Sequence, residues 1–105
     1  MKVLWVEAAT PLAEAGAGVV NRRWTTPWRG DVALLEEGRG VVARGRLDSI
    51  HEGAGAFCCS GGDPRPGMFH LYLTDVVPLR SAVPMRKQLG MPDLPVADER
   101  EVRSS

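Results

Sequence analysis

Short apolar runs, separated by glycines and prolines, constrain this chain more than any other feature of its sequence. Twelve glycines and eight prolines are spread over 105 residues. Runs with valine, leucine and aromatic residues lie between these breaks, and their length is typical of strands. We expect strands over the residue ranges 2–8, 19–24, 31–36, 41–50 and 69–73. The sequence therefore predicts a mainly β protein of the α+β class, with five to six mostly antiparallel strands curled into a small barrel.

One or two short helices should accompany these strands. Thr10 can cap a helix over residues 11–17 that starts with Pro11, and Gly16 and Gly18 stop this helix after about two turns. The glycines of residues 37–40 predict a tight hairpin turn, and Gly45 is placed to form a bulge within its strand.

The chain has the size and composition of one globular domain. Its residues are 44% hydrophobic and 25% charged, which permits a core and excludes an intrinsically disordered chain. We assign residues 1–95 to this domain, with an irregular loop at 51–67, and we expect the polar residues 96–105 to form a flexible tail.

The adjacent Cys58 and Cys59 favour neither a disulfide framework nor a metal site, and no apolar run is long enough for a membrane span. These features predict a cytoplasmic protein.

A formal net charge of zero conceals two basic blocks. Residues 21–46 hold six arginines against three acids, and residues 76–92 hold three basic residues and no acid. The acids gather at 47–75 and 93–105. We expect the fold to bring the two basic blocks to one rim of the barrel, which favours a phosphate-bearing partner.

Residues 21–30, NRRWTTPWRG, combine three arginines with two tryptophans. Guanidinium groups bind phosphates through paired donors, and tryptophan rings stack on unpaired bases. Asn21 can both donate to and accept from a base edge. The alternative is that Trp24 and Trp28 fill the core while the arginines are solvated.

Alternation along residues 69–73 places His70 and Tyr72 on the opposite face of that strand from its apolar residues. These two side chains either project into solvent or line a pocket together with Asn21 and Arg22.

Three segments, in order along the chain, resemble the ASCH domain family, which belongs to the PUA-like superfamily of small β-barrels. Residues 21–36 are similar to the family's Asn-Arg-x-Trp motif and the strand after it. GMFHLYL at 67–73 resembles the family's late histidine-aromatic strand, and VPMRKQLG at 83–90 resembles its closing Pro, Arg and Leu-Gly pattern. The resemblance covers about residues 11–95 and implies a PUA-like barrel.

This resemblance implies a pocket at the barrel mouth for RNA, a nucleotide or a modified nucleoside. In this hypothesis basic side chains contact phosphate, Trp24 or Trp28 stacks on a base, and Asn21 reads its edge. The residues that we expect to contact the ligand are Asn21, Arg22, Trp24, Trp28, Arg29, His70, Tyr72, Arg86 and Lys87.

Catalysis is not favoured by the same resemblance. One family branch resembles an amidohydrolase that uses a lysine and a threonine at the positions of Ala17 and Val20, and neither apolar side chain can transfer a proton or attack a carbonyl. We therefore expect a binding module without a cofactor or metal. The alternatives are a small hydrolase, either an amidohydrolase or a ribonuclease, with a divergent active site, and a protein-interaction module on the same barrel.

Overall fold

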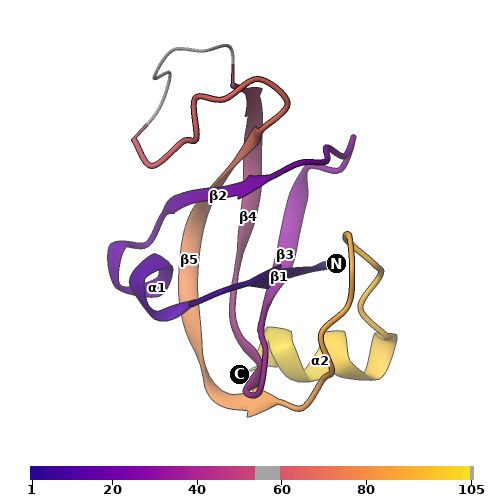
Figure 1. Ribbon diagram of the computed structural model, residues 1–105. Helices are drawn as coiled ribbons and strands as arrows, with labels where there is room; N and C mark the ends of the chain where they lie inside the picture. The colour runs from indigo at the N-terminus through magenta and orange to yellow at the C-terminus, as the bar shows by residue number, and fades with distance from the viewer. Residues whose placement is uncertain (54–59, 105) are drawn as a thin grey trace.

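A computed structural model describes residues 1–53 and 60–104, and five strands form one curled sheet within them (Figure 1). The strands are β1 (Lys2–Val6), β2 (Gly18–Arg22), β3 (Gly30–Glu36), β4 (Gly40–Glu52) and β5 (Phe69–Val83). Their order across the sheet is β1-β3-β4-β5-β2, in which β1 and β3 are parallel and all other neighbours are antiparallel. The sheet curls into a half-barrel, which confirms the predicted mainly β fold with mostly antiparallel strands.

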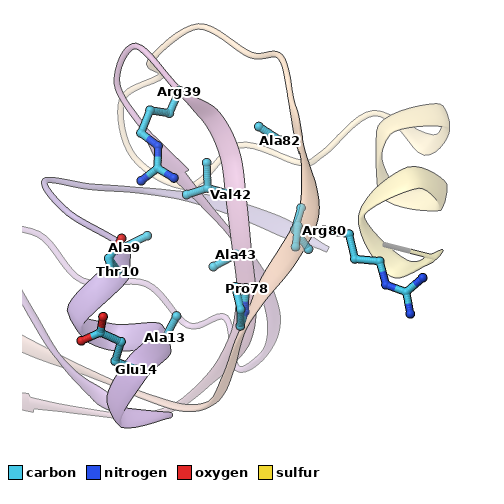
Figure 2. Close-up of a pocket in the computed structure, with 11 residues that line it drawn as sticks. Ala9, Thr10, Ala13, Glu14, Arg39, Val42, Ala43, Pro78, Arg80 and Ala82 are labelled. Atoms are coloured by element: carbon cyan, nitrogen blue, oxygen red, sulfur yellow. The ribbon is translucent and has the colours of Figure 1, made fainter.

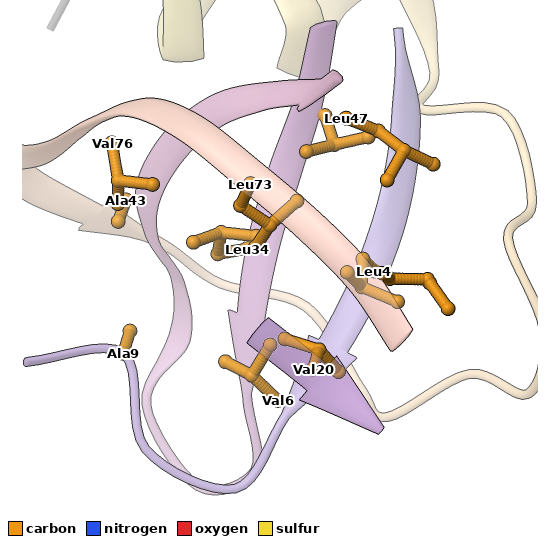
Figure 3. Close-up of a cluster of buried hydrophobic side chains, with 11 residues drawn as sticks. Leu4, Val6, Ala9, Val20, Leu34, Ala43, Leu47, Leu73 and Val76 are labelled. Carbon is orange, nitrogen blue, oxygen red and sulfur yellow. The ribbon is translucent and has the colours of Figure 1, made fainter. Parts of the chain in front are cut away.

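Alternate residues of β3 pack on opposite faces of the sheet. Val32 and Leu34 belong to the core inside the curl, part of which Figure 3 shows. Ala33 and Leu35 belong to a second core on the outer face. Because both faces of this strand are covered, apolar residues are needed at consecutive positions, and all four side chains are 0% exposed.

Glycines end α1 (Thr10–Ala15) and shape β4. Gly16 adopts the left-handed conformation, with φ at 76°, and ends the helix as predicted. The predicted cap at Thr10 is wrong, because Thr10 is already helical and the N-cap residue, Ala9, forms no side-chain capping bond. Gly40 begins β4 with φ at 86°, and a Cβ there would collide with the backbone of Val83. Between Arg44 and Arg46 of β4 the single residue Gly45 faces two residues of β5, Asp75 and Val76, so a bulge lies here, but its extra residue is on β5 and not at Gly45 as predicted.

Residues 96–104 form a second helix, α2 (Val96–Ser104), and the expected flexible tail is wrong for this segment. Val102 is 0% exposed and packs in the outer core. Arg103 pairs with Asp31 of β3 at 3.0 Å, which fixes the helix to the sheet. A segment this polar does not predict a packed helix. Ion pairs and one buried valine are nevertheless enough to dock it on the sheet. No helix among the described residues has the length and apolar character needed to cross a bilayer.

One side chain connects the two edges of the sheet. Arg22 of β2 donates from Nη2 to the carbonyl oxygen of Trp5 in β1, and from Nη1 to the carbonyl oxygen of Asn21 at 2.7 Å. Its guanidinium also pairs with Glu7 at 3.4 Å. Burial lowers the pKa of Arg22, and the Glu7 carboxylate opposes this shift. Arg22 therefore bridges β1 and β2, which are at opposite ends of the strand order.

Candidate functional site

A small cavity gathers aromatic and basic side chains from β1, from the end of β2 and from residues 84–90. It has a volume of about 180 Å³, and its walls include Trp5, Arg22, Trp24 and Lys87. We call it the Trp5 cavity. Lys87 Nζ lies 3.8 Å from the centroid of the Trp5 ring, and Arg22 Cζ lies 5.3 Å from it. Both distances are within the range of cation–π attraction, so Trp5 holds one cation from each of the two basic blocks.

A basic groove adjoins the Trp5 cavity, and Lys87 lines both. The basic groove has a volume of about 560 Å³ and lies between the 37–40 turn and residues 84–87, with Arg39 and Arg86 in its walls beside one acid, Glu37. Arg39 is paired with Glu36 at 3.0 Å. Neither Arg86 nor Lys87 forms an ion pair within the described part of the chain. Arg39 of the first block therefore shares this groove with Arg86 and Lys87 of the second, whereas Arg44, Arg46 and Arg80 line other cavities, so only part of the two basic blocks meets.

Asn21 and His70 are neighbours across β2 and β5, and both hold the loop that follows the undescribed residues. Asn21 Oδ1 accepts a hydrogen bond from the Asp63 amide at 2.8 Å, and Asn21 Nδ2 donates to the Gly61 carbonyl at 2.9 Å. His70 Nε2 contacts the Asp63 carbonyl oxygen, and because a carbonyl only accepts, this nitrogen carries the proton. His70 is 1% exposed, so it does not project into solvent. Neither Asn21 nor His70 lines the Trp5 cavity or the basic groove.

The loop at residues 60–67 is tied internally by Asp63 and Arg65. Arg65 Nη2 lies 2.6 Å from Asp63 Oδ2. Hydrogen bonds from the side chain and backbone of Arg65 lower the pKa of the Asp63 carboxyl to about 2. Gly53 lies directly beneath this loop, where any Cβ would collide with the carbonyl oxygens of Asp63 and Arg65. These contacts seat the loop closely over the end of the sheet.

Trp28, Arg29 and Tyr72 lie outside the Trp5 cavity. Trp28 packs partly against the inner core, and Lys2 Nζ lies 5.7 Å from the centroid of its ring. Arg29 Nη1 donates to the carbonyl oxygens of Thr26 and Trp28, at 3.0 and 2.7 Å, and so shapes its own loop. Tyr72 is 38% exposed. Trp24 also packs partly against the inner core, but of the two tryptophans in residues 21–30 it is the one that lines the Trp5 cavity with Arg22 and Lys87.

Trp5 and Arg39 are the site residues that sequence reasoning missed. Trp5 lies in an apolar run and Arg39 in a turn, and neither context by itself indicates a binding residue. For Trp5 the sequence does hold one indication, which is the alternation of inward and outward side chains along β1. Leu4 and Val6 belong to the inner core, which leaves Trp5 on the outer face of β1.

A third cavity lies between α1 and the strands β4 and β5 (Figure 2). Its volume is about 380 Å³, and small side chains such as Ala9, Ala13 and Ala43 form much of its wall. Glu14 also lines it, whereas the Arg80 side chain points away from the other lining residues in Figure 2. None of the predicted site residues lines this cavity.

Val20 belongs to the inner core and is 5% exposed, so it is a packing residue. No family model, curated protein or solved structure matches this chain. Its function therefore has to be inferred from the residues themselves.

Proposed function

We propose that this protein is a binding module for RNA or a nucleotide, related to the ASCH domains, and that the Trp5 cavity and the basic groove form its binding surface. The observation that carries the proposal is the position of Lys87, which lies over the Trp5 ring and lines both hollows. A ligand that combines a flat ring with a phosphate is complementary to this combination of indole and cation.

The size of the two hollows supports a division between base and phosphate. The Trp5 cavity, at about 180 Å³, is smaller than the roughly 300–1,000 Å³ of most small-molecule sites, so it suits one base and not a whole nucleotide. The basic groove is larger, at about 560 Å³, and opens beside it. The phosphates of a bound strand would then follow the groove.

Each side chain has a distinct role in this proposal. Trp24 stacks on an unpaired base, an interaction worth about 1–3 kcal/mol. Lys87 and Arg86 contact phosphates, since neither has a carboxylate partner among the described residues. Arg22 supports the Trp5 cavity from its position between the two sheet edges, because its donors already face carbonyl oxygens.

The resemblance to ASCH domains gives independent support. Two of its three segments, residues 21–36 and 83–90, supply Trp24 and Lys87 to the Trp5 cavity. These segments are far apart in the sequence, and the fold brings them to one place.

The test is a binding titration of short single-stranded RNA at several salt concentrations. Trp24→Leu should weaken binding by about 5- to 150-fold, which corresponds to the loss of one stacked base. Lys87→Ala should weaken binding and reduce the magnitude of the salt slope by about 0.7, the value for one lost phosphate contact on a single strand.

Arg100→Ala is the matched control, because Arg100 is exposed on α2 and its removal changes the net charge equally. This variant should bind RNA as the wild type does. Absence of binding at low salt, or equal weakening by Lys87→Ala and Arg100→Ala, would contradict the proposal.

Incubation with N4-acetylcytidine and with RNA should yield no product, and a product would favour the hydrolase alternative instead.

A further inference from the structure

We infer a second anion-binding site, formed by Arg44 and Arg46 of β4 on the outer face of the sheet. A cavity of about 260 Å³ lies at the bulge and is lined by these arginines together with Met1, Asp31, Gly45 and Asp75. The ligand class is a small anion with paired oxygens, a carboxylate or a phosphate, because each guanidinium presents a fork of donors that matches such a group. This site does not depend on the proposed RNA surface, which shares none of its residues.

Strand pairing places both arginines on the same face. Arg44 is opposite Ala33 of β3, and Arg46 is opposite Asp31. Ala33 belongs to the outer core, and residues two apart on a strand face the same side. Arg44 and Arg46 therefore both face outward, next to the surface on which Arg103 of α2 pairs with Asp31.

The guanidinium of Arg44 lacks any acceptor in the described part of the chain. Its Nε is buried without a hydrogen-bond partner, and the whole side chain is only partly exposed. Leaving a buried N–H donor unsatisfied away from water is costly. A bound ion or water is the usual explanation for such a group. Arg46 likewise forms no ion pair with the described residues.

Two of the nearby carboxylates, Asp31 and Glu99, are engaged elsewhere. Asp31 accepts from Arg103 at 3.0 Å, and Glu99 lies 2.6 Å from the Met1 amino group. Asp75 lines the cavity but forms no ion pair within the described residues. The unpaired side chains of the lining thus carry two positive charges against one negative charge. An anion would complete this balance.

Asp75 also has an unusual backbone. Its φ is 51°, and among the described residues it is the only one other than glycine with a positive φ. It lies directly at the bulge. It is one of the two β5 residues that face the single residue Gly45 of β4, where a Cβ would lie 3.0 Å from Val76 Cγ2. The cavity therefore lies at this backbone irregularity.

The experiment is an NMR titration of the whole folded protein with inorganic phosphate and, separately, with malonate, at constant ionic strength. The Arg44 Nε–Hε resonance and the backbone amide of Gly45 are expected to shift and to saturate. The arm with the lower dissociation constant identifies the ligand as a phosphate or a carboxylate. Shifts that rise linearly without saturation in both arms would overturn the proposal.

Arg46→Gln is the main variant, because Arg46 is exposed and its loss does not disturb packing. It should raise the dissociation constant by about tenfold or more, the effect of losing a charged hydrogen-bonding partner. Arg100→Gln removes an equal charge from α2 and should leave the dissociation constant unchanged. Equal binding by wild type and Arg46→Gln would also refute the site. Lys87→Ala should bind the anion normally, which separates this result from the outcome for RNA.

Discussion

Arg22 lies in the most distinctive stretch of the sequence, yet its guanidinium faces protein groups. It donates to the carbonyl oxygens of Trp5 and Asn21 and pairs with Glu7. A guanidinium uses the same donors for a phosphate as for a carbonyl, so residue type alone does not distinguish these roles. Arg22 takes the structural role because the curl of the whole sheet brings the edge strands β1 and β2 together beside it.

Arg22→Gln should lower the free energy of unfolding by about 1–3 kcal/mol, since the bridge between the sheet edges is lost and a part-buried carbonyl loses its donor. Urea denaturation measures this change. Arg29→Gln is the matched control, because Arg29 is exposed and contacts only its own loop, and it should change stability by no more than about 0.5 kcal/mol. Equal effects of the two substitutions would show that Arg22 bridges nothing.

Asp63 predicts a specific acid response. Its folded pKa of about 2 lies below the ordinary value of 3.8 because Arg65 donates hydrogen bonds to the carboxylate. A depressed folded pKa stabilises the protein above the unfolded pKa, and this contribution disappears as the pH falls from about 4 through about 2. Asp63→Asn should remove this part of the pH dependence of stability, measured by denaturant unfolding between pH 2 and pH 5. Asp48→Asn, a substitution at an exposed position of β4 and away from the 60–67 loop, should leave this pH dependence unchanged.

At the scale of the elements, hydrophobic alternation and glycine positions were sufficient to predict most of the sheet. The hairpin turn at 37–40 and the end of α1 at Gly16 depend on local backbone geometry, and local sequence encodes that. The bulge was expected at Gly45, but its extra residue lies on the paired strand β5, which depends on the pairing of the two strands. The parallel pairing of β1 with β3 and the helix at 96–104 were not predictable in the same way. The pairing and the helix both depend on which strand edge and which apolar surface are still exposed to solvent once the sheet has curled.

The docking of α2 depends on Val102, which is its buried residue. Val102→Ala should cost about 1–3 kcal/mol, because it removes two methyl groups from the outer core and leaves a cavity. Val96→Ala on the same helix should be nearly neutral, since Val96 is 77% exposed. Chemical denaturation measures both, and amide hydrogen exchange within 96–104 should increase only for Val102→Ala. Identical exchange in the two variants would mean that Val102 does not anchor the helix.

For the whole molecule, the distribution of charge was a better guide to the candidate site than any single motif. Residues from both basic blocks meet around Lys87, which the sum of charges along the chain concealed. Trp24 and Lys87 were predicted and lie together, whereas Asn21 and His70 hold the 60–67 loop. Which polar side chains are taken up by a loop depends on how that loop packs, and a sequence of glycines and prolines does not specify such packing.

The order β1-β3-β4-β5-β2 also has a consequence for how the chain reaches this fold. Both edge strands come from the first 22 residues, and Val20 of β2 pairs with Leu71 of β5. During synthesis, residues 19 and 20 thus leave the ribosome well before their partners exist. Contacts between segments so distant in sequence are slow to form, and an apolar strand that waits for its partner is open to pairing with other chains. The N-terminal segment is therefore the part of the sheet that waits longest for its partner strands while the remainder is being made.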